Sequence, residues 1–261
     1  MIGIYLSGTG NTEHCVRKLV RLLDESAQAI PMEKKETVYL LSQHDFIVFA
    51  YPVQFSNVPV MVKDFIKSHL DLWKGKKILC VATIGLFSGD GAGYSARLLK
   101  KYGAEIVGGF HIRIPDSVCD VKLLKKFFQE NREIIWKADR KIEKCAEEIR
   151  KGRYPKNVPH LYNRIAGLLC QRLWYYGRTR SYSDKLKISN ACTGCGLCTR
   201  LCPADNLRNC RKMEKPPENT VRCVTGASVS VRQGRSRYWD TQSLSSAAMI
   251  NIAKAEKSEI I

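Results

Sequence analysis

Apolar positions follow two alternating periods along the first 150 residues of the chain. Four short apolar runs have the length and composition of buried strands, and they span residues 1–7, 45–52, 76–85 and 104–115. After each run, apolar residues recur every three or four positions, as on one face of an amphipathic helix, over residues 13–26, 59–70, 93–103 and 120–151. This alternation predicts an α/β domain over residues 1–150, in which a parallel sheet is covered by helices on both faces.

The pattern changes at residue 151. Lys151 to Ser189 forms a basic, aromatic linker that contains one amphipathic helical segment, LYNRIAGLLCQRLWYY. Docking of this segment against a domain and binding to a membrane surface both agree with its pattern. We expect a small cysteine-rich domain over residues 190–235 and a disordered tail over residues 236–261.

Composition restricts the class of protein. A hydrophobic fraction of 44% and a charged fraction of 26% are typical of a globular protein. No apolar run is long enough to span a bilayer and the N-terminus lacks the features of a signal peptide, so we expect a cytoplasmic protein without a transmembrane segment.

Charge is concentrated in one band. The formal net charge is +18, and residues 150–215 carry fifteen Lys or Arg against Asp184, Asp205 and Glu214. Such a band suits an acidic redox partner, nucleic acid or anionic lipid, and charge alone does not choose among them.

The segment Ser7 to Glu13, SGTGNTE, predicts a phosphate site. It combines glycines, the N-terminus of a helix and the hydroxyls of Ser7, Thr9 and Thr12, which together suit a phosphate monoester. It lacks the lysine of a nucleotide-binding P-loop and the spacing of a dinucleotide-binding loop. The alternative is a glycine-rich turn that only caps the helix.

A cysteine run follows the linker. Cys192, Cys195, Cys198 and Cys202 precede Pro203 in CTGCGLCTRLCP, which is the spacing of bacterial 4Fe-4S ferredoxins. Zinc sites usually pair two separated C-x-x-C turns, so the run favours an iron-sulfur cluster. The other cysteines, namely Cys15, Cys80, Cys119, Cys145 and Cys170, are scattered and are expected to be small buried hydrophobic residues.

The N-terminal half resembles the flavodoxin family. SGTGNT is similar to the loop that binds the FMN phosphate, while YPVQFSNVP and IGLFSGDGAGYS resemble the loops that border the flavin ring. The resemblance implies a doubly wound, parallel five-stranded sheet of flavodoxin order. It also implies FMN binding by Ser7, Thr9, Gly10, Asn11, Thr12, Pro52, Val53, Phe55, Asn57, Gly85, Phe87, Ser88 and Gly91. Tyr51 and Phe55 are candidates for ring contact or, equally, for packing in the core.

Both halves together resemble fused flavodoxin/ferredoxin electron-transfer proteins of anaerobic microbes. That family carries a second cysteine run, whereas only Cys210 and Cys223 follow here, so the ferredoxin-type (α+β) iron-sulfur domain is incomplete. Three cysteines of the run would need Cys210 or Cys223 as a fourth ligand.

We hypothesise that the tail is encoded out of frame. Val221, Val224, Ala227 and Val231 have the spacing that shifted cysteine codons would require, since a codon starting with GT or GC after a T reads as Cys. The alternative is a natural, divergent tail, and the nucleotide sequence across codons 200–240 distinguishes the two.

The resemblance implies an electron-transfer protein that passes electrons between a 4Fe-4S cluster and FMN, with a redox partner protein. No catalytic acid, base or nucleophile stands out, so whether the chain is also an enzyme stays open. One alternative is a flavin or quinone reductase that uses FMN alone. Another is a nucleic-acid-binding module that uses the basic linker.

Overall fold

A computed structural model of the chain describes residues 1–156, apart from 55, 86–88, 90 and 116–127. Its described part forms one sheet of five parallel strands in the order β2-β1-β3-β4-β5. The strands are β1 (Ile2–Tyr5), β2 (Gln28–Pro31), β3 (Phe46–Pro52), β4 (Lys77–Ile84) and β5 (Glu105–Arg113). The helices are α1 (Asn11–Leu23), α2 (Glu36–Ser42), α3 (Val60–Ser68), the 3-10 helix η1 (Leu70–Trp73), α4 (Gly91–Lys101) and α5 (Phe128–Arg150).

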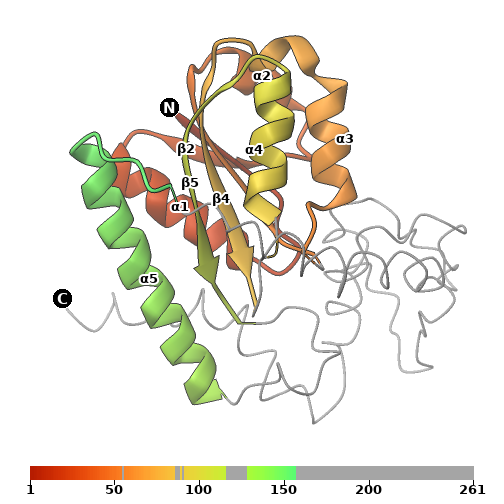
Figure 1. Cartoon of the computed structure of the whole chain (residues 1–261). Helices are drawn as coiled ribbons and strands as arrows, with labels where there is room; N and C mark the ends of the chain where they lie inside the picture. Colours follow the sequence, from red (N-terminus) through yellow and green to blue (C-terminus); the bar gives the residue numbers. More distant parts are fainter. Residues whose placement is uncertain (55, 86–88, 90, 116–127, 157–261) are drawn as a thin grey trace, which may run out of the picture.

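Helices cover both faces of this sheet (Figure 1). Helices α1 and α5 pack on one face, and α2, α3 and α4 pack on the other. Strand β3 contributes residues to the core on both faces of the sheet. Ile47 and Phe49 face the α3 side, while Val48 and Ala50 face the α1 side. All four are fully buried, which explains why the strand is an unbroken apolar run.

The predicted α/β architecture is confirmed within the described residues. Each of the four predicted apolar runs contains a strand, and the predicted helices coincide with α1, α3, α4 and, from residue 128, α5. The pattern missed β2 and α2. Strand β2 pairs only with β1 and is half-exposed, so its sequence QAIP carries no run of buried residues.

The strand order positions the loops. Strand β1 lies between β2 and β3, and the chain leaves β1 for α1 on one face but leaves β3 for α3 on the opposite face. In open α/β sheets, ligands bind beyond the carboxyl ends of the strands at such a switch point. The loops after β1, β3 and β4 are therefore the place to look for a site.

The remaining domain predictions lie beyond this part of the chain. Nearly all of the linker predicted over 151–189, the iron-sulfur domain predicted over 190–235 and the tail over 236–261 fall outside the described residues. Among the helices that are described, none combines the length and the apolarity needed to cross a bilayer.

Candidate functional site

The loop between β1 and α1 presents free backbone donors. Gly10 has a left-handed backbone (φ 86°) that turns the chain into α1, and His14 N–H donates the first helical hydrogen bond to Gly10 O at 2.9 Å. No side chain caps this helix end within the described residues. The N–H groups of the first turn, from Asn11 onward, are thus available to an anion, and the helix dipole favours a negative charge there.

The three predicted hydroxyls differ in their surroundings. Ser7 Oγ is buried and has no hydrogen-bond partner within the described part of the chain. Thr9 is half-buried in the loop. Thr12 is 1% exposed, and its Oγ1 lies 2.8 Å from Oγ1 of Thr83 on β4. An unpartnered buried hydroxyl costs free energy, so Ser7 is suited to an acceptor that arrives with a ligand.

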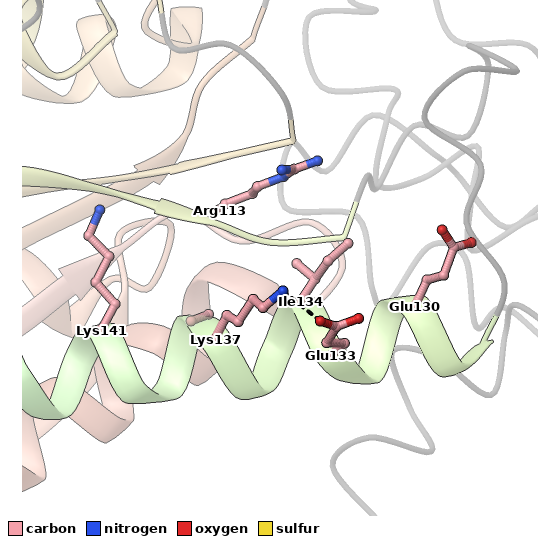
Figure 2. Close-up of a pocket in the computed structure, with 7 residues that line it drawn as sticks. Arg113, Glu130, Glu133, Ile134, Lys137 and Lys141 are labelled. Atoms are coloured by element: carbon pink, nitrogen blue, oxygen red, sulfur yellow. Dashed lines mark hydrogen bonds and ion pairs between the residues drawn. The ribbon is translucent and has the colours of Figure 1, made fainter.

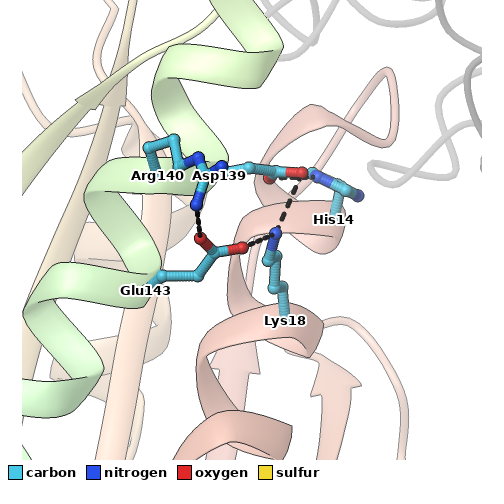
Figure 3. A network of polar contacts seen from close by, with 5 residues as sticks. All are labelled: His14, Lys18, Asp139, Arg140 and Glu143. Carbon is cyan, nitrogen blue, oxygen red and sulfur yellow. Dashed lines mark hydrogen bonds and ion pairs between the residues drawn. The ribbon is translucent and has the colours of Figure 1, made fainter.

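Helix α1 is anchored on two sides. Asn11 Nδ2 donates to Pro115 O, just beyond β5, at 3.3 Å. On the other side His14 and Lys18 contact the Asp139 carboxylate of α5 at 2.8 and 3.1 Å (Figure 3).

The same network extends along α5. Lys18 also pairs with Glu143 at 2.8 Å (Figure 3). Burial would raise the pKa of the Asp139 carboxyl, but its hydrogen bonds with His14 and Lys18 outweigh burial and lower that pKa below its ordinary value. These contacts hold the first turns of α1 in place without using the loop itself.

The loops after β3 and β4 lie against each other. After β3, Gln54 and Asn57 exchange backbone hydrogen bonds at 3.0 and 2.9 Å. A Cβ built on Gly89 would lie 2.2 Å from Ser56 Cβ, and one built on Gly91 would lie 2.4 Å from Val53 Cγ2. Glycine at both positions therefore permits a close approach of the two loops.

Other predicted site residues extend this edge. Pro52 ends β3, the Asn57 side chain accepts a hydrogen bond from Val58 N–H at 2.9 Å, and Gly85 O accepts one from Arg113 Nε at 3.2 Å. The predicted residues Phe55, Phe87 and Ser88 lie outside the described residues.

Tyr51 belongs to the core rather than to an open face. Its side chain is fully buried and its ring contacts that of Phe49 edge-on, with centroids 6.0 Å apart. Its hydroxyl donates to Gly91 O at 2.8 Å and contacts Ser95 Oγ. Of the two roles left open by the sequence, Tyr51 takes that of an anchor, which ties β3 to the start of α4.

A charged groove lies beside this edge (Figure 2). It has a volume of about 300 Å³ and is lined by Arg113, Glu130, Glu133, Ile134, Lys137, Ala138 and Lys141. Glu133 and Lys137 pair with each other at 2.5 Å. None of the predicted cofactor-binding residues lines it, so the groove is separate from the candidate site.

His111 on β5 is a half-buried residue outside the site, and its Nε2 atom is buried. Its Nε2 has no hydrogen-bond partner within the described residues, and burial, reinforced by Lys141, lowers the pKa of its imidazole to about 4. The unfolded chain therefore binds a proton at this residue between pH 6.5 and 4 that the folded chain does not bind. The contribution of neutral His111 to the free energy of unfolding is complete above pH 6.5 and is lost as the pH falls toward 4.

We expect His111→Gln to flatten this pH dependence. The free energy of unfolding of the wild-type chain should fall between pH 6.5 and 4 by up to about 3 kcal/mol more than that of the variant. Urea titrations at pH 7, 5.5 and 4 measure the difference. If the free energy of unfolding fell equally with pH for both proteins, His111 would take up its proton in the folded chain at the same pH as in the unfolded chain.

The sequence predicts metal ligation only by the cysteine run. No group of His, Cys, Asp or Glu within the described residues is arranged to hold a metal ion. Cys192, Cys195, Cys198 and Cys202 lie outside those residues. Cys15 and Cys80 are each 1% exposed and unpaired, which confirms their prediction as small buried hydrophobic residues, and Cys145 is half-buried.

Three residues that position this edge were missed by the sequence analysis. Thr83 supports Thr12, Ser95 supports Tyr51, and Asp139 holds His14. Thr83 carried a signal, because it is a polar residue near the end of an otherwise apolar strand, KILCVATI. Asp139 carried none, since acidic residues are common along its helix.

The N-terminal part of the chain is similar to a known protein family. Residues 2–107 match a family described as "Flavodoxin domain". No curated protein matches the chain. The strand order gives this part of the chain a flavodoxin-like α/β fold, and the similarity to the flavodoxin domain agrees with that fold.

Solved structures with similarity to the chain include three flavodoxins. That of Megasphaera elsdenii in the two-electron reduced form is 23% identical, covers 42% of this chain and 85% of its own, and has a TM-score of 0.39. That of Fusobacterium nucleatum bound to flavin mononucleotide is 19% identical, with coverages of 58% and 98% and a TM-score of 0.41. Flavodoxin 2 of Bacillus cereus is 18% identical, with coverages of 58% and 97% and a TM-score of 0.43.

Proposed function

We propose that this chain is an electron-transfer protein whose flavodoxin-like domain binds FMN beyond the carboxyl ends of β1, β3 and β4. The observation that carries the proposal is the loop Ser7–Glu13, which combines a helix N-terminus and a buried Ser7 hydroxyl that both lack a side-chain partner among the described residues. The match of residues 2–107 to the flavodoxin domain supports it.

The phosphate group would be held without a cationic side chain on the loop. Ser7, Thr9, Gly10, Asn11 and Thr12 supply hydroxyls and backbone N–H groups, and SGTGNTE contains no Lys or Arg. Glu13, the one acidic residue of the loop, is paired with Arg17 at 2.7 Å, which reduces its repulsion of an anion. Backbone donors at a helix N-terminus are sufficient to bind a phosphate.

The flavin ring would lie against the loops after β3 and β4. Pro52 ends β3, and Val53, Phe55 and Asn57 belong to the loop that follows it. Gly85, Phe87 and Ser88 belong to the loop after β4, and Gly91 begins α4. The two loops are in contact through Ser56 and Gly89, so they form one wall rather than two independent segments. Bound FMN supplies one- and two-electron chemistry, while the chain binds it, orients it and limits its contact with water.

The cysteine run extends the proposal to a second redox group. Cys192, Cys195 and Cys198 would hold an iron-sulfur cluster, with Cys210 or Cys223 as the fourth ligand in place of the one that the missing second run would provide. Cys202, whose spacing is that of a ligand to the second cluster, would be left without one. A cluster that exchanges single electrons with FMN would link an obligate one-electron partner to a two-electron carrier. The basic band over residues 150–215 suits an acidic partner protein.

Binding of FMN by the full-length chain tests the first part of this proposal. We expect titration to quench FMN fluorescence, and we expect Ser7→Ala to weaken FMN binding by about tenfold while leaving riboflavin binding unchanged. Riboflavin lacks only the phosphate, so the comparison isolates the loop. Ser42→Ala, which alters an exposed serine at the end of α2, is the control and should bind both flavins as the wild-type chain does.

Two results would contradict the assignment. Absence of FMN binding by the wild-type chain would remove the function, and equal losses for FMN and riboflavin in Ser7→Ala would remove the phosphate role of the loop. Iron and sulfide content after anaerobic reconstitution tests the cluster separately, with at most about four iron atoms per chain expected.

A further inference from the structure

A buried pair of hydroxyls connects the candidate phosphate loop to the sheet. Thr12 is the second residue of α1 and Thr83 lies near the carboxyl end of β4, 71 residues later in the chain. Their Oγ1 atoms are 2.8 Å apart, and their side chains are 1% and 0% exposed. The bond therefore joins the start of α1 to the carboxyl end of β4, and both hydroxyls are shielded from water.

The number of hydroxyl protons limits how Thr12 and Thr83 can hydrogen-bond. Each hydroxyl has one proton and two acceptor positions, and one hydrogen bond between them uses only one of the two protons. If Thr12 donated, the remaining proton would belong to Thr83, beneath α1, where Val81 of the same strand is part of an apolar cluster. If Thr83 donates, the remaining proton belongs to Thr12, the residue at the helix N-terminus.

An anion at the helix N-terminus selects between the two arrangements. A phosphate oxygen accepts protons and offers none when fully ionised, so its presence favours the arrangement in which Thr12 still has a proton to donate. A hydroxyl that accepts a hydrogen bond is also polarised to donate a stronger one. Thr83 then acts on the ligand only through Thr12.

We propose that Thr83 is a positioning residue for the phosphate of FMN, which donates its hydroxyl proton to Thr12 and thereby directs the Thr12 proton to the phosphate. This inference rests on the proposed function and adds a residue that lies outside the loop. It accounts for the presence of a threonine in the buried part of β4, where the neighbouring positions are apolar.

Thr83→Val tests the inference because valine preserves the shape of threonine and removes only the hydroxyl. We expect the dissociation constant for FMN to rise by about tenfold and that for riboflavin to stay unchanged. Thr83→Ser keeps the hydroxyl and should retain wild-type affinity for FMN. If valine impairs folding, Thr83→Ala removes the same hydroxyl with less bulk and replaces it in the comparison.

A double-mutant cycle shows whether Thr83 acts through Thr12. In a Thr12→Val background, Thr83→Val should cause no further loss of FMN affinity, since the group that it orients is gone. Independent losses from the two substitutions would overturn the inference. So would equal losses for FMN and riboflavin in Thr83→Val, which indicate a purely structural role, or unchanged binding of FMN.

The experiment separates this inference from the proposed function. Failure of the wild-type chain to bind FMN refutes the function, whereas wild-type binding with an unaffected Thr83→Val variant refutes only the role of Thr83. Inorganic phosphate, which needs the loop but no flavin, provides a second probe. Its stabilisation of the wild-type chain against thermal unfolding should be reduced in Thr83→Val and retained in Thr83→Ser, and equal stabilisation of both variants would contradict the role of Thr83.

Discussion

Gly89→Ala is expected to weaken FMN binding by about a hundredfold. Gly89 has φ +49°, and the added Cβ would lie 2.2 Å from Ser56 Cβ and 2.4 Å from Ser56 Oγ. A left-handed alanine costs about 1–2 kcal/mol and overpacking costs about 1–3 kcal/mol. In the proposed complex the two loops stay together against the flavin. Most of the strain energy should therefore reduce the free energy of FMN binding. Fluorescence titration with FMN measures it.

Two further substitutions make this prediction specific. Gly75 has a similar backbone (φ +76°) but a Cβ there would meet nothing within 4 Å, so Gly75→Ala carries the backbone strain without the clash and should leave FMN affinity unchanged. Ser56→Gly removes the clashing atoms at a residue that itself has φ 57°, where glycine is tolerated. The double variant Gly89→Ala/Ser56→Gly should bind FMN about tenfold more tightly than Gly89→Ala alone. Without that recovery, contact between the loops is not the cause.

Trp73→Ala should destabilise the fold by about 3–5 kcal/mol. Trp73 is fully buried at the end of η1, its ring lies edge-on to Phe49 and Phe65 with centroids 5.7 and 6.0 Å away, and its indole N–H donates to Ile66 O at 2.9 Å. Alanine would leave a cavity between α3 and the sheet and an unsatisfied carbonyl. Urea unfolding followed by circular dichroism measures the loss without relying on tryptophan fluorescence.

Trp136 provides the matched control. It lies on α5, is 58% exposed and has Arg140 over its ring at 5.5 Å. Trp136→Ala should change the free energy of unfolding by less than about 1 kcal/mol, because surface substitutions rarely cost more. Similar losses for the two variants would mean that η1 is not part of the cooperative core.

Hydrophobic periodicity was sufficient for most of the architecture. Ile47 to Ala50 are buried in both layers, so β3 is recognised as a continuous apolar run, and the spacing of Val16, Leu19 and Val20 marks the buried face of α1. Strand β2 and helix α2 were missed because they bury few residues. Gln28–Pro31 pairs on one side only, and α2 buries just Thr37 and Leu41, so neither segment has an informative pattern.

The candidate site was predictable in part. The loop Ser7–Glu13 is contiguous in sequence, and the types and spacing of its glycines and hydroxyl residues are sufficient to indicate a phosphate ligand. The sequence did not indicate that Thr12 pairs with Thr83, 71 positions later, while Ser7 Oγ has no partner among the described residues. The contact of Gly89 with Ser56 likewise depends on two loops that only the sheet brings together.

The sequence by itself determined the layers of the described domain, the place of the candidate phosphate loop and the cysteine spacing, because periodicity, turn chemistry and motif spacing are local properties of the chain. Tertiary structure alone decided that Tyr51 is an anchor, that Ser7 keeps a hydroxyl without a partner among the described residues and that Thr12 is joined to β4. Those outcomes depend on the strand order β2-β1-β3-β4-β5, which places distant residues within hydrogen-bonding distance and shields them from water.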